Sequence, residues 1–245
     1  MHRHLCNERK KMVSGIFYSA SYLVNVLKEL WNPLTESQCL LLLDNVTVKG
    51  YKKGEIIYHE QEIPQHLFFL ADGKVKIYKE GVGGRQQIVR MPELKGFFGY
   101  RAGLVGTPYI TEAAALEDTT LCLIPLPVIK QLIRENHTVA LFFIEHLATL
   151  LGHADEQTVS LTQKHLRGRL AEALLIMKDR YGADLKSNTL AMEPSREDLA
   201  NLSNMTTSNA IRTLSSFVSE RLVAADGRKI TILDEPQLRL IAKNG

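Results

Sequence analysis

A short stretch near the carboxyl end of the chain carries polar side chains at spacings suited to reading DNA. Residues 194–226 contain two short helical patterns separated by a tight turn. The second pattern exposes side chains that can meet base edges and phosphates: Thr207, Ser208, Asn209 and Arg212. The pattern predicts a helix-turn-helix, although it also fits a small helical subdomain with an ordinary polar face.

Local signals mark where these two helices must begin. Ser195 with Asp198 three residues later resembles a capping box, and Thr206 is placed to cap the second helix. Asn204 stands in the turn, where a positive φ costs Asn or Gly least. The turn dipeptide at residues 226–227 precedes a strand pattern, so we expect a β-hairpin "wing" to close the unit.

Composition limits the class of protein. A chain of 245 residues suggests two domains, and 45% hydrophobic residues suffice for real cores. The net charge of +3 and the pI of about 8.7 permit nucleic-acid binding without proving it. Cys6, Cys39 and Cys122 are sparse and far apart, which indicates free thiols in a reducing cytoplasm. No apolar run is long enough to span a bilayer, so no membrane partner is expected.

Residues 1–21 form an extension outside the predicted domains. Residues 12–26 follow a basic cluster and superficially resemble a signal peptide, but polar residues interrupt them and no convincing cleavage site follows. An extra amphipathic helix, a disordered arm and a start placed too early, with Met12 as the alternative, stay open.

The middle of the chain changes from helical to strand patterns and back. Helical spacing over residues 22–30 and a helix capped by Thr35 come first. Short β-type runs and turn residues then alternate over residues 46–125, which indicates a barrel or sandwich. A short helix over residues 128–134 and a long one over residues 136–161 follow, and another is predicted from residue 166 to residue 181.

The long helix carries two apolar lines. One has the alternating three- and four-residue spacing of a coiled-coil seam, and we interpret it as the dimer contact: Ala140, Phe143, Leu147, Leu150, Ala154 and Leu161. The other is expected to pack on the β domain: Leu141, Ile144, Ala148 and Leu151. A helix that is apolar on two sides needs two partners. We favour a second copy of the chain, related by a two-fold axis, over a helix sandwiched within one chain.

The order of β domain, long helix and winged helix-turn-helix resembles the bacterial regulators typified by the cyclic-AMP receptor protein and the fumarate–nitrate reductase regulator, the CRP/FNR family. The resemblance extends from about residue 22 to the end and is carried by the order and spacing of KGEII (53–57), LFFL with DGKVKI (67–77), GFFG (96–99) and SREDLA (195–200). It implies an α+β fold in three parts: an N-terminal double-stranded β-helix (cupin-like β-roll) effector domain at 22–135, a dimerisation helix at 136–163, and a C-terminal winged helix-turn-helix at 164–245.

The resemblance further implies a transcriptional regulator, not an enzyme, that binds a near-palindromic operator as a homodimer. RNA polymerase is a further implied partner. The expected DNA contacts are Ser195, Arg196 and Thr206 to phosphates, and Thr207, Ser208, Asn209 and Arg212 to bases. Arg212 matches the last base-reading arginine of the family and would grip guanine O6 and N7. The alternative is a sensor or scaffold that uses its β-roll without binding DNA.

The phosphate-binding cassette departs from the cyclic-nucleotide pattern. Phe97 stands where the glutamate that holds the ribose belongs, and Tyr109 and Ile110 replace the Arg–Ser pair that faces the phosphate. We therefore expect cyclic-nucleotide binding to have been lost. Either a filled core or an aromatic pocket for another small effector is expected, lined by Phe97, Phe98, Tyr100, Arg101 and Tyr109.

No cofactor, metal or catalytic residue is expected. Three cysteines do not supply the roughly four thiolates of an iron–sulfur cluster. His2, His4 and Cys6 are residue types that bind metals, and they lie close together in the sequence. They fall, however, in an extension that we expect to be disordered. A cupin-like enzyme would need several His and Glu side chains converging on a metal, and His59, Glu60, Glu62 and His66 are close neighbours that rarely point to one centre.

Overall fold

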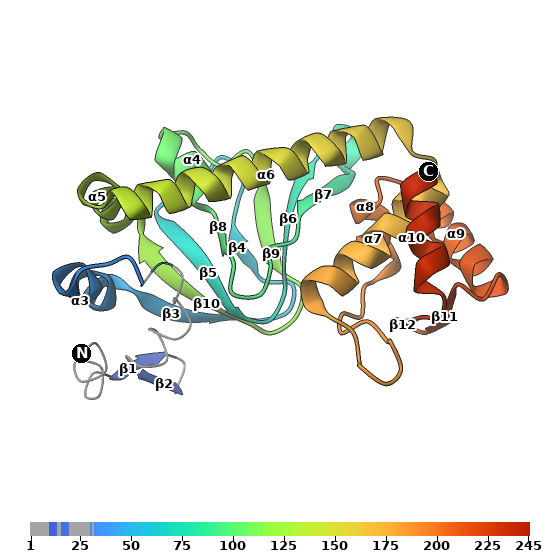
Figure 1. Cartoon of the computed structure of the whole chain (residues 1–245), viewed down its shortest axis with the longest axis horizontal. Coiled ribbons are helices and arrows are strands. Elements are labelled where there is room, and N and C mark those ends of the chain that lie inside the picture. Colours follow the sequence, from blue (N-terminus) through green and yellow to red (C-terminus); the bar gives the residue numbers. More distant parts are fainter. Residues whose placement is uncertain (1–9, 14–15, 20–29, 31) are drawn as a thin grey trace. The chain divides into compact units, whose positions relative to one another are not determined.

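The computed structural model describes residues 10–13, 16–19, 30 and 32–245 (Figure 1). The predicted helix over residues 22–30 lies outside the described residues, except for Leu30. The chain divides into two compact units, one of residues 1–79 with 90–149 and one of residues 80–89 with 150–245. A long helix, α6 (His137–Gln163), contributes to both.

Two four-stranded sheets form the β-roll, as the strand patterns and the resemblance predicted. The first sheet has the order β3 (Thr47–Tyr51), β10 (Thr119–Pro125), β5 (His66–Asp72), β8 (Phe97–Phe98). The second has the order β4 (Ile56–Tyr58), β9 (Glu112–Ala115), β6 (Val75–Glu80), β7 (Gln86–Arg90). A short 3₁₀ helix, η1 (Val82–Gly84), lies between β6 and β7 in the sequence. Apart from β6 and β7, which are consecutive in the chain, neighbours in sheet order are far apart in sequence, which is how a roll differs from a meander.

The central strand β5 is apolar on both faces because both faces are covered. Leu67 and Phe69 belong to the core beneath the helices, whereas Phe68 stacks on Phe98, with ring centroids 5.2 Å apart. Alternate side chains of a strand point to opposite faces. The run of four buried residues at 67–70 therefore serves two packing layers at once.

Helices cover one side of this roll. Helix α3 (Glu36–Asn45) begins with the predicted Thr35 cap, whose side chain and that of Gln38 form a capping box. Helices α4 (Tyr100–Val105), α5 (Leu126–Glu135) and the first half of α6 follow. Val139 and Phe143 of α6 are buried in the core that α3, α5 and β5 share. Figure 1 shows this first half of α6 passing over the strands of the roll.

The extension before residue 22 contains paired strands. Strands β1 (Lys10–Val13) and β2 (Ile16–Ser19) pair antiparallel, with Val13 opposite Ile16. This pairing was not among the expectations for the extension, which were a helix, a disordered arm or a misplaced start. Among the described residues, no helix is both long and apolar enough to cross a membrane.

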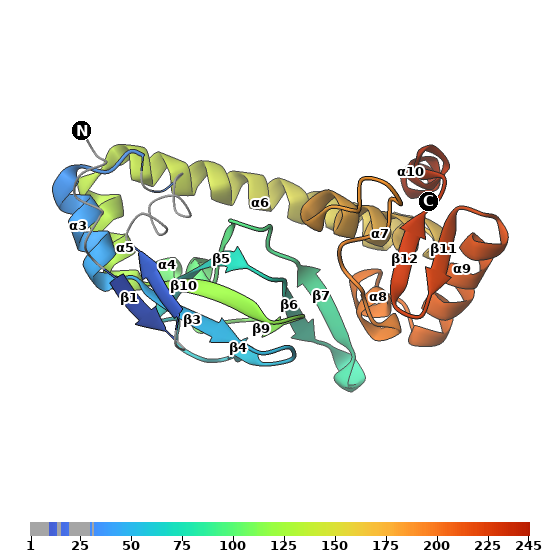
Figure 2. The same ribbon diagram turned by 90° about the horizontal axis from the view of Figure 1, so that it is seen from below.

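The second unit contains the helix-turn-helix and its wing. Helix α7 (Leu166–Tyr181) ends, as predicted, at Gly182, which has a φ of 83°. Helices α8 (Arg196–Leu202) and α9 (Thr207–Ser219) are followed by strands β11 (Val223–Asp226) and β12 (Lys229–Ile232). A final helix, α10 (Glu235–Asn244), was not predicted. Figure 2 shows the two wing strands beside α8 and α9.

Candidate nucleic-acid interface

Capping side chains fix the start of both helices of the predicted helix-turn-helix. The Ser195 hydroxyl accepts from the Asp198 backbone N–H at 3.0 Å, and the Asp198 carboxylate accepts from the Ser195 backbone N–H at 3.3 Å. Thr206 Oγ1 accepts from the Asn209 backbone N–H at 3.2 Å, which caps α9. Asn204 has a φ of 49° in the turn between them. These features confirm the predicted caps and turn.

Helix α9 has one buried and one exposed face. Its inner face is formed by Ala210, Thr213, Leu214 and Phe217, each less than 9% exposed. Its outer face presents Thr207, Ser208 and Arg212 to solvent, with Asn209 half-buried. Because the apolar face fixes the rotation of the helix about its axis, the polar side chains at its N-terminal end are the ones offered to a ligand.

Two of the outer residues are joined to each other. Arg212 Nη2 donates to Asn209 Oδ1 at 2.5 Å. The two residues are three apart on the helix and therefore lie on the same face. The structure thus brings together two of the four residues expected to read bases.

The Arg196 side chain, expected to contact a phosphate, makes a contact within the protein instead. Its Nη2 donates to the carbonyl oxygen of Gly227 in the wing turn at 2.8 Å. Its Nη1 is buried and has no hydrogen-bond partner among the described residues. In this structure the side chain links the start of α8 to the wing turn, and a phosphate contact from it stays a prediction.

A clamp that sequence spacing did not suggest holds the C-terminal end of α9 to α7. Arg167 donates through Nη1 and Nη2 to the two carboxylate oxygens of Glu220, at 2.7 and 2.6 Å, and through Nη1 to Ser216 Oγ at 2.8 Å. Its guanidinium carbon lies 5.0 Å from the centre of the Phe217 ring. A planar guanidinium fits both a carboxylate fork and an aromatic face. Glu220 lies 53 residues from Arg167 in the sequence, so no local motif predicts that the two residues pair.

Because of this ion pair, the stability of the second unit is expected to vary with pH in the acid range. Hydrogen bonds from Arg167 and Ser216 lower the pKa of Glu220 to about 2. A depressed carboxyl pKa contributes stability above the ordinary value near 4.5, and that contribution is lost as pH falls toward 2. We therefore expect Glu220→Gln to lower the unfolding temperature at pH 7, with the difference from wild type shrinking below about pH 4.5.

Thermal unfolding of both proteins between pH 7 and pH 3 measures this effect. Glu193→Gln, at an exposed position of the same unit, is the matched control and should show no such dependence. A Glu220→Gln difference that stays constant across the range would contradict the role of the ion pair.

The two apolar lines of α6 have the opposite environments from those that we expected from the sequence. Phe143 is 2% exposed and lies against Tyr100, and Leu147 packs on the same core. Leu141, Ile144 and Leu151, expected to pack on the roll, are instead 51%, 60% and 65% exposed. The expected dimer contact through Phe143 is therefore wrong, because that ring fills the core of its own unit. Both lines have helical spacing, so spacing alone did not distinguish them.

The remaining residues of the expected seam have mixed environments. Ala140, Leu150 and Leu161 are half-buried, and Ala154 is exposed. They form no continuous exposed line with Phe143 and Leu147. The exposed apolar line of α6 is therefore Leu141, Ile144, Ala148 and Leu151.

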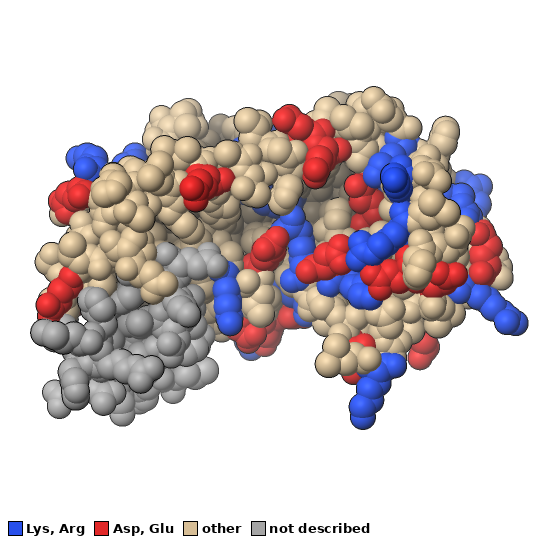
Figure 3. Space-filling model, viewed as in Figure 1, with Lys and Arg blue, Asp and Glu red and all other residues tan. Residues whose placement is uncertain are grey.

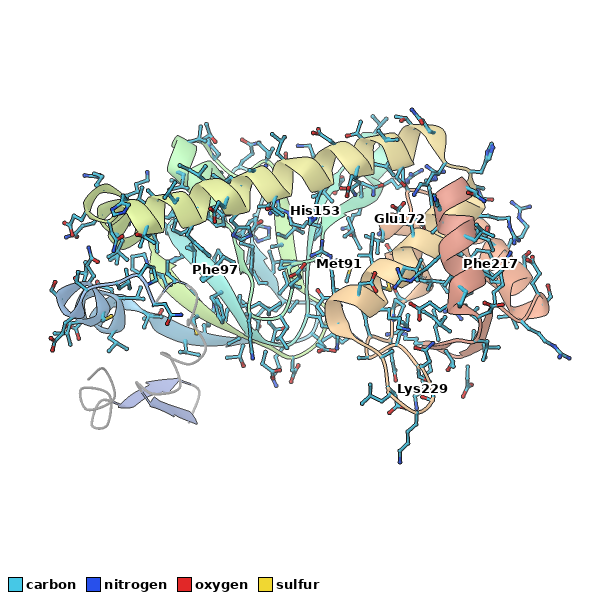
Figure 4. All side chains as sticks on the ribbon, in the orientation of Figure 1. Met91, Phe97, His153, Glu172, Phe217 and Lys229 are labelled. Atoms are coloured by element: carbon cyan, nitrogen blue, oxygen red, sulfur yellow. The ribbon has the colours of Figure 1, made fainter. Side chains whose placement is uncertain are left out.

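The residues expected to line an effector pocket fall into separate clusters. Phe97, labelled in Figure 4, packs against Phe69 and Phe142 in the core beneath α6, with ring centroids 4.9 and 5.8 Å away. Phe98 points to the other face of the same short strand, toward Phe68. The expectation of one pocket shared by both phenylalanines is wrong, since alternate residues of a strand face opposite ways.

The other three expected pocket residues do not converge on one point either. Tyr109 stacks on Tyr58 with ring centroids 3.8 Å apart, Tyr100 packs against Phe143 and His146, and Arg101 is exposed. The hydroxyls of Tyr100 and Tyr109 are buried without a partner among the described residues. Burial raises the pKa of both phenols, that of Tyr100 to about 12.

The His and Glu residues considered as metal ligands have separate partners. His59 Nδ1 lies 3.0 Å from Glu112 Oε2, while Glu60 pairs with Lys79 at 2.6 Å. Glu62 accepts from the backbone N–H of His59 at 3.1 Å. Within the described part of the chain, no three His, Cys, Asp or Glu side chains are grouped as metal ligands would be. His2, His4 and Cys6 lie outside the described residues.

A β-roll joined by a long helix to a winged helix-turn-helix defines a class of protein, the two-domain DNA-binding transcription regulators. Residues 48–136 match the model of the cyclic nucleotide-binding domain, and residues 168–241 match that of the Crp-like helix-turn-helix domain. The chain belongs to the CRP/FNR family.

Individual relatives agree with this membership. The chain is 24% identical over 206 residues to the transcriptional activator protein Anr of Pseudomonas protegens, covering 82% of this chain and 83% of that one. It is 24% identical over 189 residues to the transcriptional regulatory protein btr of Bordetella pertussis, covering 77% and 78%. The structure of FixK2 from Bradyrhizobium japonicum matches with a TM-score of 0.73 and 25% identity, covering 80% of this chain and 96% of that one.

These relatives settle the broad class of function. The chain is a CRP/FNR-type transcription regulator with a helix-turn-helix DNA-binding domain, and its named relatives are transcription regulators, not enzymes. Members of the family bind DNA and typically act as dimers.

Proposed function

We propose that this chain binds a near-palindromic operator as a homodimer, with α9 of each copy in a major groove. The observation that carries the proposal is the division of α9 into a buried apolar face and a polar N-terminal end, where Thr207, Ser208 and Arg212 are exposed and Asn209 is half-buried. Hydroxyl, amide and guanidinium groups are those that pair with base edges. The N–H groups at the start of the helix, beside Thr206, favour a phosphate.

Binding to random duplex fragments at several salt concentrations tests DNA binding itself. Neutralised phosphates release counterions, so we expect affinity to fall steeply as salt rises. The alternative is a sensor or scaffold that uses its roll without touching DNA. It predicts no binding even in dilute buffer, and that result would overturn the proposal.

The proposed dimer contact is the exposed apolar line of α6, formed by Leu141, Ile144, Ala148 and Leu151. These residues recur every three or four positions, which is the spacing of a seam between two helices. Glu145 is the only Asp, Glu, Lys or Arg between residues 137 and 154, and the N-terminal half of α6 is largely uncharged on the side visible in Figure 3. Each fully buried leucine or isoleucine contributes about 1.5–3 kcal/mol, so a few pairs suffice for a stable contact.

We further propose that the roll has lost cyclic-nucleotide binding. Aromatic rings from both sheets stack between them: Tyr58 of β4 lies 5.9 Å from Phe68 of β5 and 3.8 Å from Tyr109. All three side chains are at most 5% exposed. A nucleotide would have to displace this stack, and Phe97 replaces the expected ribose-binding glutamate with a side chain that cannot accept a hydrogen bond.

Calorimetric titration with cyclic AMP and cyclic GMP tests this loss. We expect no saturable heat at millimolar nucleotide. Saturable binding of either nucleotide would overturn it. Binding of a different small effector, and contact with RNA polymerase, stay predictions from the sequence.

A further inference from the structure

The bond between Asn209 and Arg212 restrains both side chains. Asn209 sits in the first turn of α9, where the Thr206 hydroxyl holds its backbone N–H at 3.2 Å. Its side-chain oxygen already accepts from Arg212 Nη2 at 2.5 Å. The first turn is therefore fixed at one end by the cap and at the other by the arginine one turn later.

The bonded oxygen of Asn209 is also the group that recognition of adenine would use. An asparagine that recognises adenine needs its oxygen to accept from N6 while its amide N–H donates to N7. An amide oxygen has two lone pairs, so Asn209 can still accept one bond from a base while it accepts from Arg212, and its Nδ2 donors stay available for DNA. Those donors suit acceptor atoms such as guanine O6 and N7 or thymine O4.

The same bond restrains the arginine. Arg212 is exposed, and its long side chain would otherwise sample many rotamers. One terminal nitrogen is held by Asn209, while the other N–H groups of the planar fork stay available for guanine O6 and N7. Holding a side chain in its bound geometry reduces the entropy lost on binding.

We propose that Asn209 is a positioning residue for Arg212, which holds the guanidinium in place to read a guanine. The inference rests on the proposed function, since it requires α9 to enter the major groove. It adds that Arg212 depends on Asn209 for its position, and it names the base edges that the two side chains can contact.

The test measures how full-length protein binds its selected operator with each of the four bases at every half-site position. Asn209→Ala removes the acceptor but keeps the backbone N–H that Thr206 caps. We expect it to reduce the preference for guanine at the Arg212 position by about fivefold, with other positions changed less than about twofold. Arg212→Ala should abolish that preference, and adding Asn209→Ala to it should relax the position no further.

A conservative variant separates positioning from a structural role. Asn209→Asp keeps an acceptor for Arg212, so the guanine preference should survive, although the added negative charge should weaken binding to every sequence. Ser219→Ala is the control, because the Ser219 hydroxyl bonds the Ser216 carbonyl oxygen at 2.8 Å at the far end of the same helix. It should change neither affinity nor preference.

Three results would overturn the inference. Asn209→Ala could relax an adenine position and leave the guanine preference intact, could weaken all sequences equally, or could be matched by Asn209→Asp in its loss of guanine preference. A wild-type protein without any base preference would overturn the proposed function and this inference with it. The first three outcomes, in a protein that selects an operator, would overturn the inference alone.

Discussion

Replacing Phe217 by alanine is expected to lower the free energy of unfolding of the second unit by about 3–5 kcal/mol. Phe217 of α9, labelled in Figure 4, is fully buried in that unit, and Arg167 covers its ring at 5.0 Å. Removing the ring leaves a cavity and withdraws the surface on which the clamp from α7 rests. Because whole domains are stable by only about 5–15 kcal/mol, such a loss is large.

Chemical denaturation, monitored by circular dichroism, measures the free energy of unfolding of Phe217→Ala. Val218→Ala is the matched control, since it changes the next residue, whose side chain is 40% exposed. We expect the control to cost less than about 1 kcal/mol. Equal losses in the two variants would mean that Phe217 does not hold α9 in place.

The second large effect is expected on the exposed line of α6. Replacing Ile144 and Leu151 together by glutamate places four carboxylates in a two-fold interface, where burying unpaired charge is costly. We expect the dissociation constant of the dimer to rise at least about 100-fold. Operator affinity should fall with it, because two linked copies bind two half-sites at a high effective concentration.

Analytical ultracentrifugation over a concentration series measures the dissociation constant. The control is the pair Thr149→Glu and His153→Glu, at exposed positions on a different side of α6, which adds the same charge. The control should remain dimeric. A double variant at Ile144 and Leu151 that is as dimeric as wild type would place the contact elsewhere.

The second unit was largely predictable because local signals define its elements. Gly182, with a φ of 83°, ends α7 where the glycine predicted, and the caps of Ser195 and Thr206 place α8 and α9. Helix α10 was missed although its signals are present: Asp234 accepts from the backbone N–H of Gln237 at 2.9 Å, and a proline follows in the first turn.

Features that depend on long-range packing were not predictable in the same way. The spacing of α6 shows two apolar lines but not which one meets the roll, a choice that the contact of Phe143 with Tyr100 makes in the folded chain. Phe97 and Phe98 were expected in one pocket, because their opposite directions matter only once β8 pairs with β5. The partners Arg167 and Glu220 come together only after α7 and α9 have packed.

Selection of duplexes from a random library by the full-length protein tests whether two copies of α9 read one operator. We expect enrichment of an inverted repeat whose half-site centres lie one helical turn, roughly 10–10.5 base pairs, apart. We further expect that Arg212→Ala relaxes one symmetric pair of positions by about 10-fold or more. Enrichment of a single unpaired half-site, or of no sequence at all, would contradict the proposed function.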